Sequence, residues 1–565
     1  MKNIAIIKKN TLEIFIIIFV FFILWILLAA KIKVAPNSSD ILYYFEIGNK
    51  HIADPLILNR YIHVYLQQFF VSLAGSALQG LQIYWAFLFS GTLALIYASG
   101  RFFSVKSTPY HGILSVLLFL SLPAITEIAG TPFIDVTAMF FTVAFIFTFL
   151  MSSKNKHDNK LLLVTLGLLF FCSFKTKETT LPLAILLIPL SFSDNKINLQ
   201  ILCQRLLLVV IGISIGITLL ILINAVYLKE PFFGLRLSDL KYYMNTNMAD
   251  KGFVVSGLTR EDWLVGYFFR YAFLPTILYI ISGTINILKL EIDQRFVFII
   301  PLALIFFLVI SINNIYGFQT RFALPTLAVI CITASQFITI DTSRFSLTHK
   351  RFLLTLSGSI LFSIAMVMLI RHIELRKGVD LALFFTTFLN AVLIIILISI
   401  IFLDKNTAFG SIACISIIMA LLLLPLDITY KNIFINQANR SKFEETIAPI
   451  VEYGDVLKFT NNSHLLIDKT AVDSGPIAMA KNIDEVIGLI NLCYDSKLER
   501  TNVRLVDDTS NIKSDLIMAP KYDYLLLSSK TWNEISIDTE LNIHLNENYI
   551  VINGVETNTV LLYAR

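Results

Sequence analysis

The sequence predicts a polytopic α-helical membrane protein with about 13 transmembrane helices and a small C-terminal extracytoplasmic α/β domain. Of its 565 residues, 56% are hydrophobic and 15% are charged, and the mean hydropathy is +0.74. A soluble domain does not need so many apolar residues, because a single hydrophobic core stops growing well below this length. Apolar runs recur as far as residue 426, and a more polar composition follows. We therefore expect a transmembrane domain over 1–426 and an extracytoplasmic domain over 427–565.

The transmembrane helices are predicted from apolar runs that approach the roughly 20 residues a helix needs to cross a bilayer. The fifth and sixth runs are short, and only Lys175-Thr176-Lys177-Glu178 separates them, so they could form a buried hairpin instead. The runs cover residues 12–30, 81–100, 110–126, 136–151, 161–174, 178–192, 206–227, 264–288, 296–312, 322–340, 352–370, 381–403 and 409–426.

The flanking charges predict a cytoplasmic N-terminus and an integral protein of the plasma (inner) membrane. Lys2, Lys8 and Lys9 precede the first run, which starts like a signal peptide but is long enough to remain as a transmembrane helix. Every predicted inner loop is then basic, as the positive-inside bias requires, and an odd number of spans places the C-terminus outside. Seven cations fall on the outer side, where they would snorkel to the interface or bind an anion: Lys175, Lys177, Arg270, Arg321, Arg371, Arg376 and Lys377.

Two predicted outer loops are long, and long ordered loops commonly carry function. The first covers residues 31–80, and its part from 61 to 77 is apolar enough to lie in the membrane interface as a helix. The second covers residues 229–263. We expect ligand contacts from polar and aromatic side chains of these loops, namely Tyr44, Tyr61, His63, Tyr242 and Tyr243.

The polar C-terminal region predicts five short strands and one helix. The strand-like runs are His464–Ile467, Val503–Val506, Tyr524–Leu527, Tyr549–Ile552 and Val560–Tyr563, and a helix fits Ile483–Tyr494. This mixture is typical of a small α/β domain. Because the region has neither a Gly-rich phosphate loop nor a nucleophile elbow, we expect it to shape acceptor access or stability and assign it no catalysis.

Charge and cysteine content exclude several classes of protein. The formal net charge of +5 is small and scattered, which argues against nucleic-acid binding. The five cysteines form no CxxC or Cys/His pair, so they indicate neither a disulfide framework nor a structural zinc site. No dense ligand cluster demands a metal cofactor, although a carboxylate pair beside a phosphate would suit a divalent cation.

The expected active site lies at the outer membrane boundary, just past the first span. Ionisable residues are costly in a membrane protein, so a carboxylate gathered there with cations and aromatics indicates function. One reaction that such a group of residues could support is sugar transfer from a polyprenyl phosphate. This reaction needs a carboxylate that takes the proton of the acceptor hydroxyl and cations that hold the departing phosphate. Asp40 is the candidate base, and Asp135 and Glu127 are candidate acceptor or metal contacts. The candidate phosphate-binding cations are Arg60, Lys175, Lys177, Arg270 and Arg321.

Several motifs, in their order along the chain, resemble those of the GT-C superfamily of membrane glycosyltransferases. The similarity is greatest to the branch of protein O-mannosyltransferases and lipid A aminoarabinose transferases, whose first outer loop often reads Asp-Glu-x-x-Tyr. Here Asp40 and Tyr44 match, and Ile41 replaces the second acid. The further resembling segments are Asn59–Tyr65, Thr131–Asp135, Lys175–Glu178 and Tyr316–Pro325. The resemblance implies an inverting glycosyltransferase with a polyprenyl-phosphate monosaccharide donor, which acts on a glycan, lipid or protein acceptor.

Each candidate residue also has an ordinary structural explanation. Asp40 could be a solvated loop carboxylate or a helix cap, and Asp135 and Glu127 could simply mark the ends of spans. Glu178 could pair with Lys175 or Lys177. In addition, Arg321 could snorkel to the headgroups, His63 could be a hydrogen-bonding side chain, and Tyr242 and Tyr243 could be interface aromatics.

Two other functions remain open from the sequence. A polymerase or ligase for lipid-linked glycans also needs many spans, but it usually places its key residues in a late, large loop. A transporter or flippase tends to show paired halves and charges near the membrane midplane. We see no internal repeat, and the polar residues gather at the outer boundary, so the transporter ranks last.

Overall fold

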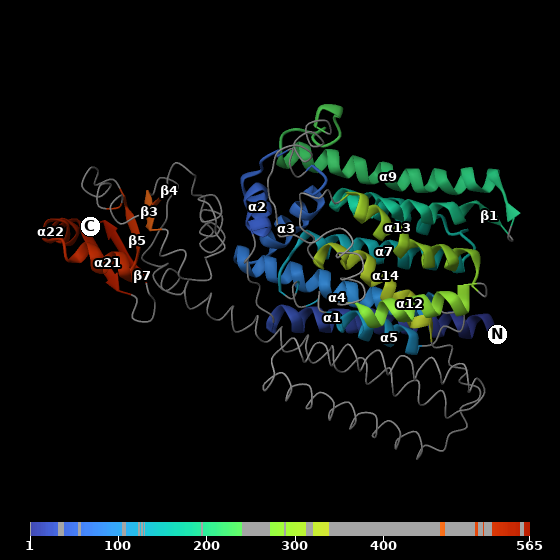
Figure 1. Cartoon of the computed structure of the whole chain (residues 1–565). Helices are drawn as coiled ribbons and strands as arrows, with labels where there is room; N and C mark the ends of the chain where they lie inside the picture. The colour runs from blue at the N-terminus through green and yellow to red at the C-terminus, as the bar shows by residue number, and fades with distance from the viewer. Residues whose placement is uncertain are drawn as a thin grey trace, which may run out of the picture.

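A computed structural model describes residues 2–31, 39–54, 58–103, 109–122, 125, 128, 130–193, 196–239, 272–287, 290–311, 320–337, 464–468, 503–506, 512, 522–553 and 559–564. The N-terminal part is a helical bundle (Figure 1). Its α-helices are α1 (Lys2–Lys31), α2 (Ser39–Lys50), α3 (Tyr61–Leu73), α4 (Ala77–Phe103), α5 (Pro109–Leu120), α7 (Ile134–Lys154), α8 (Lys160–Thr176), α9 (Leu199–Tyr227), α12 (Phe273–Asn286), α13 (Ile292–Ser311) and α14 (Leu324–Ala334).

Among the described residues, three helices are long and apolar enough to cross a membrane by length and composition, namely α4, α7 and α9. The chain is thus an integral membrane protein. Ten of the thirteen predicted spans overlap described helices, one of them a 3₁₀-helix, and 352–370, 381–403 and 409–426 lie outside the described residues. The number of 13 spans therefore stays a prediction.

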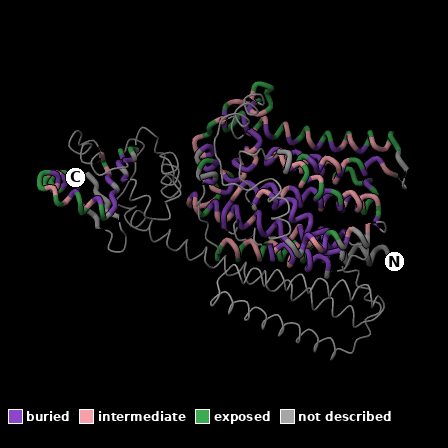
Figure 2. The backbone as a smooth tube through the Cα atoms, in the orientation of Figure 1, coloured by how far each residue is buried: buried purple, intermediate pink, exposed green. Residues whose placement is uncertain are grey.

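Burial separates inner from peripheral helices (Figure 2). Helix α7 packs against α4, α8 and α14. Of its most apolar stretch of 18 residues, 83% is buried, compared with 22% of the corresponding stretch of α9. The outer face of α9 exposes large apolar side chains, which is how a lipid-facing helix differs from a soluble one.

Glycines bring α8 and α9 into close contact. A Cβ atom added to Gly167 would lie 1.9 Å from the Val209 carbonyl oxygen, and one added to Gly212 would lie 1.9 Å from the Val164 carbonyl oxygen. Small residues at such crossings let two helix backbones approach within membranes.

The predicted sixth span forms a 3₁₀-helix. This element, η2 (Glu178–Ser191), contains Pro182 and Pro189 and is surrounded by α7, α8, α9 and α13. Proline cannot donate a backbone hydrogen bond and disfavours a continuous α-helix, which accounts for the departure from α geometry. A short hairpin follows, formed by β1 (Phe192–Ser193) and β2 (Lys196–Ile197). Two further 3₁₀ segments, η4 (Thr320–Ala323) and η5 (Ser335–Phe337), flank α14.

The C-terminal region contains a five-stranded mixed sheet. Its strands are β3 (Leu465–Asp468), β4 (Val503–Val506), β5 (Tyr524–Ser528), β6 (Tyr549–Asn553) and β7 (Thr559–Ala564), in the order β4-β3-β5-β7-β6. The first three strands of this order are parallel, and β7 runs antiparallel to β5 and β6. Helices α21 (Ser529–Ser536) and α22 (Thr539–Asn548) supply Ile535, Leu541 and Leu545 to its core.

The five predicted strands are confirmed at nearly their expected positions. The predicted helix Ile483–Tyr494 lies outside the described residues. Helix α3 coincides with most of the expected interface helix, and α2 is an additional helix in the first long loop.

Candidate functional site

Three helix junctions bring one carboxylate and two cations together in the interior. Asp135 lies in the first turn of α7, where the helix dipole stabilises a negatively charged carboxylate. Lys177 joins α8 to η2, and Arg321 lies in η4. The Lys177 ammonium donates to Asp135 Oδ1, and Arg321 Nε lies 3.5 Å from Asp135 Oδ2. Asp135 is 1% exposed, Lys177 7% and Arg321 8%, so the three form a desolvated ionic cluster.

Aromatic rings flank both cations of this cluster. The Arg321 guanidinium carbon lies 3.9 Å from the centroid of the Phe133 ring, and the Lys177 ammonium lies 4.2 Å from that of Phe322. Cations gain electrostatic attraction from an aromatic face, more so when they are desolvated. The cluster therefore holds its two cations in fixed positions beside the first turn of α7.

Lys175 is engaged elsewhere. Its ammonium donates to Asn59 Oδ1 at 3.2 Å and to the Gly234 carbonyl oxygen at 2.9 Å. It thereby ties the last turn of α8 to the segment before α3 and to the segment after α9. Lys175 and Lys177 therefore contact different partners, although both were expected to bind the donor phosphate.

Arg60 lies beside α2, the helix that carries the candidate base. Its guanidinium donates to the Tyr44 hydroxyl. Asp40 is the second residue of α2, one helical turn before Tyr44, and its side chain lies outside the described part of the structure. Tyr61 is buried, and its hydroxyl accepts from the Asp54 amide at 2.6 Å and donates to the Ile52 carbonyl at 2.8 Å.

His63 is fully buried, although it was expected among the loop contacts. Its Nδ1 lies 2.8 Å from Thr137 Oγ1 and 3.0 Å from the Tyr84 hydroxyl, and these two oxygens lie 2.8 Å apart. Burial lowers the pKa of His63 to about 3, so the imidazole is neutral at physiological pH. Glu127, Arg270, Tyr242 and Tyr243 lie outside the described residues.

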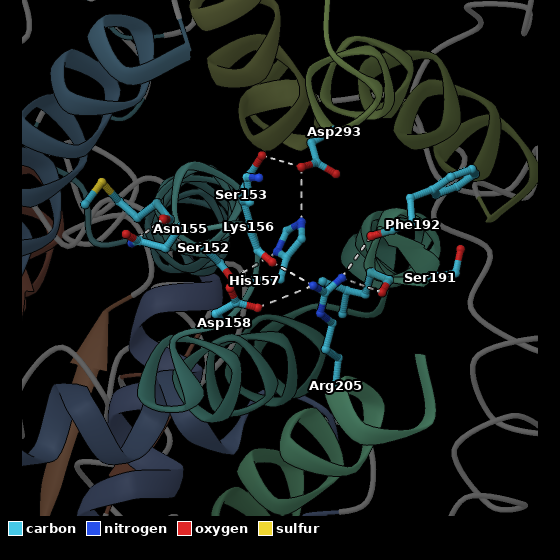
Figure 3. A network of polar contacts seen from close by, with 12 residues as sticks. Ser152, Ser153, Asn155, Lys156, His157, Asp158, Ser191, Phe192, Arg205 and Asp293 are labelled. Carbon is cyan, nitrogen blue, oxygen red and sulfur yellow. Dashed lines mark hydrogen bonds and ion pairs between the residues drawn. The ribbon is translucent and has the colours of Figure 1, made fainter. Parts of the chain in front are cut away.

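A second polar cluster occupies the opposite end of α7, roughly 30 Å away by helix length. Figure 3 shows His157 between Ser152 Oγ, 3.0 Å from Nδ1, and Asp293 Oδ2, 3.1 Å from Nε2. Arg205 donates to the carbonyls of Leu190, Phe192 and Lys156. Although Ser152, His157 and Asp293 resemble a hydrolytic triad, Ser152 is fully buried. We interpret the cluster as a structural link between the ends of α7, η2, α9 and α13.

Within the described ranges, no group of three or more His, Cys, Asp or Glu side chains could hold a metal ion. The sequence predicted the three charged residues of the ionic cluster but not the aromatic residues that contact its cations. Phe133 and Phe322 lie inside the resembling segments Thr131–Asp135 and Tyr316–Pro325, so a search for aromatics beside these charges would have found them. Tyr84 and Thr137 gave no signal, because their contact with His63 depends on the packing of three helices.

Comparison with solved structures shows a similar fold. ArnT from Cupriavidus metallidurans matches in its apo state and bound to undecaprenyl phosphate, with TM-scores of 0.54, 13% and 14% identity, and 98% coverage of both chains. An oligosaccharyltransferase from Archaeoglobus fulgidus matches with a TM-score of 0.41 and 12% identity, over 96% of this chain and 73% of that one. No family model matches, and no curated protein matches significantly. The GT-C resemblance expected from the sequence is thus confirmed as a likeness of fold.

Proposed function

We propose that this chain is an integral-membrane glycosyltransferase that moves a sugar from a polyprenyl-phosphate-linked monosaccharide to a glycan, lipid or protein acceptor. The observation that carries the proposal is the buried cluster of Asp135, Lys177 and Arg321. It holds two cations in fixed positions beside one carboxylate and away from water. Cations placed in this way can bind an anionic group such as a lipid phosphate through charge-assisted hydrogen bonds.

The fold supports the same class of reaction. ArnT, a lipid A aminoarabinose transferase, has a similar fold over nearly the whole chain and has been observed with undecaprenyl phosphate. We infer that a polyprenyl phosphate is also the donor carrier here. In this proposal Lys177 and Arg321 hold the phosphate, and the site faces the extracytoplasmic side while the N-terminus is cytoplasmic.

The reaction needs one proton transfer and one displacement. Asp40 takes the proton of the acceptor hydroxyl as its oxygen attacks the anomeric carbon. The bond between the anomeric carbon and the phosphate oxygen breaks, and its electron pair leaves on the phosphate. Lys177 and Arg321 stabilise that developing charge. Attack opposite the leaving phosphate inverts the anomeric configuration. Tyr44 lies one turn after Asp40 on α2, and Arg60 donates to the Tyr44 hydroxyl, so these two residues would contact the sugar or the acceptor.

The test measures transfer by purified protein in nanodiscs from a panel of radiolabelled polyprenyl-phosphate monosaccharides. Wild type should transfer at least one sugar, Asp40→Asn should abolish transfer, and Lys177→Met should weaken binding of undecaprenyl phosphate. Asp158→Asn is the matched control, because this carboxylate is 80% exposed at the other end of α7. Undiminished transfer by Asp40→Asn would contradict the assignment of the base.

The same experiment addresses the donor and the metal. Transfer only from oligosaccharide diphosphates would favour a lipid-linked glycan ligase instead of the monosaccharide transferase. A parallel reaction with EDTA tests whether a divalent cation is needed, since loss of transfer that added cation restores would show metal dependence.

A further inference from the structure

His63 lies where four helices meet. It belongs to α3, its Nδ1 bonds Thr137 of α7 and Tyr84 of α4, and its ring packs edge-on against Tyr44 of α2. The centroids of the His63 and Tyr44 rings are 5.4 Å apart, with an interplanar angle of 78°. One rigid side chain therefore contacts both the helix that carries Asp40 and the helix that carries Asp135.

Its contacts lie close to both acids along these helices. Tyr44 follows Asp40 by four residues, so the two residues lie about one turn apart along α2. Thr137 follows Asp135 by two residues, about 200° around α7, so its bond to His63 supports the first turn from the side opposite the ionic cluster. A shift of His63 would move both first turns relative to each other.

We infer that His63 is a positioning residue that fixes the separation of α2 and α7, and with it the placement of Asp40 relative to Asp135. This inference rests on the proposed function, in which the base on α2 must face the phosphate site that Lys177 and Arg321 form beside Asp135 of α7. The hydrogen bond to Thr137 sets one boundary of the spacing, and the ring contact with Tyr44 sets the other. Both the polar edge and the bulk of the imidazole are thus required.

The variants separate these two requirements. His63→Phe keeps a ring against Tyr44 but loses the hydrogen bonds, whereas His63→Asn keeps a polar group near the position of Nδ1. Thr137→Val removes the partner hydroxyl and tests the same bond if His63→Phe does not fold. Ser90→Ala is the control, because the Ser90 hydroxyl is buried on α4 but bonds only carbonyls of its own helix.

Transfer kinetics give the first readout. We expect His63→Phe and Thr137→Val to lower kcat by about 10- to 100-fold, because misplacement by 1 Å can cost about 100-fold. The donor KM should change less than about threefold, and His63→Asn should recover part of the loss. The double variant should be no slower than the slower single variant, since both remove one contact. Unchanged kcat, or fully additive losses, would overturn the inference.

A distance measurement gives a readout that is independent of turnover. Spin labels at Tyr43→Cys on α2 and Asn155→Cys at the far end of α7, in a background without the native cysteines, report the distance from α2 to that end of α7. Both positions are exposed. His63→Phe should shift or broaden the distance distribution, and Ser90→Ala should not. An unchanged distribution would overturn the inference, whereas absence of transfer in wild type would instead contradict the proposed function.

Discussion

The charge balance of the ionic cluster predicts that two substitutions breaking the same contact will differ in cost. Lys177→Met removes the donor of the hydrogen bond between Lys177 and Asp135, and Asp135→Asn removes the negative charge of its acceptor, so both break the ion pair. After Lys177→Met, Asp135 still faces Arg321 at 3.5 Å, so one carboxylate remains matched by one cation. After Asp135→Asn, Lys177 and Arg321 both lose their shared carboxylate while they stay more than nine-tenths buried.

The magnitudes follow from this difference. Loss of one hydrogen bond to a charged group costs about 2 kcal/mol, which we expect for Lys177→Met. Loss of one partner from a buried ion pair costs about 3–5 kcal/mol, and Asp135→Asn should reach the upper end because it removes the negative charge that Lys177 and Arg321 share. The double variant removes that charge together with one of the two cations, so it should fall between the two single variants.

Thermal unfolding in detergent, followed by tryptophan fluorescence, measures this order. Lys530→Met is the control, since Lys530 is 83% exposed and its ion pair with Glu534 spans 4.0 Å. Its melting temperature should equal that of wild type. A Lys177→Met variant at least as destabilised as Asp135→Asn would refute the charge argument. Saturating undecaprenyl phosphate should stabilise wild type more than Lys177→Met.

Three further predictions concern packing and pH. Both amide atoms of Gln67 are buried without a hydrogen-bond partner among the described residues, so Gln67→Met should stabilise by about 1–3 kcal/mol, and a lower melting temperature would show that the amide has a partner. Gly212→Ala should lower the melting temperature, because its Cβ would lie 1.9 Å from a carbonyl of α8, whereas Gly75→Ala meets nothing nearer than 3.8 Å and serves as its control. The buried imidazole of His63 has a pKa of about 3 against 6.5 when unfolded, so only the unfolded chain gains a proton between these values. Stability should therefore fall by about 1.4 kcal/mol per unit as the pH drops through that window, and an equal slope in His63→Asn would contradict this.

Much of the secondary structure could be predicted from the sequence, because it depends on local pattern. The apolar runs of the first 340 residues coincide with helices, and the short runs of the C-terminal region coincide with strands. The 3₁₀ geometry of η2 was not predicted, since hydropathy does not distinguish helix types. Pro182 and Pro189 were the available signal.

The members of the ionic cluster could be predicted, but their pairing could not. Asp135, Lys177 and Arg321 were each recognisable as charges near the ends of spans. The sequence suggested Glu178 as a partner for Lys175 or Lys177, whereas in the structure Lys177 donates to Asp135, which lies 42 residues earlier. Pairing across such separations depends on how α7, η2 and η4 pack, and no local pattern records that packing. The role of Asp40 as the catalytic base remains a prediction.

The 3₁₀ geometry of η2 increases the distance that its residues span from end to end. Fourteen residues extend about 28 Å at the 2.0 Å rise of a 3₁₀-helix, compared with about 21 Å at the α-helical rise. The hydrocarbon core of a bilayer is about 30 Å thick, so a segment too short to cross as an α-helix nearly crosses in this form. Lys177 precedes one end, and Arg205 holds the carbonyls of Leu190 and Phe192 at the other. Inserting one residue would move Lys177 by about 2 Å and turn it by about 120°. The distance that η2 can span and the position of a site cation are therefore set by the same stretch of chain.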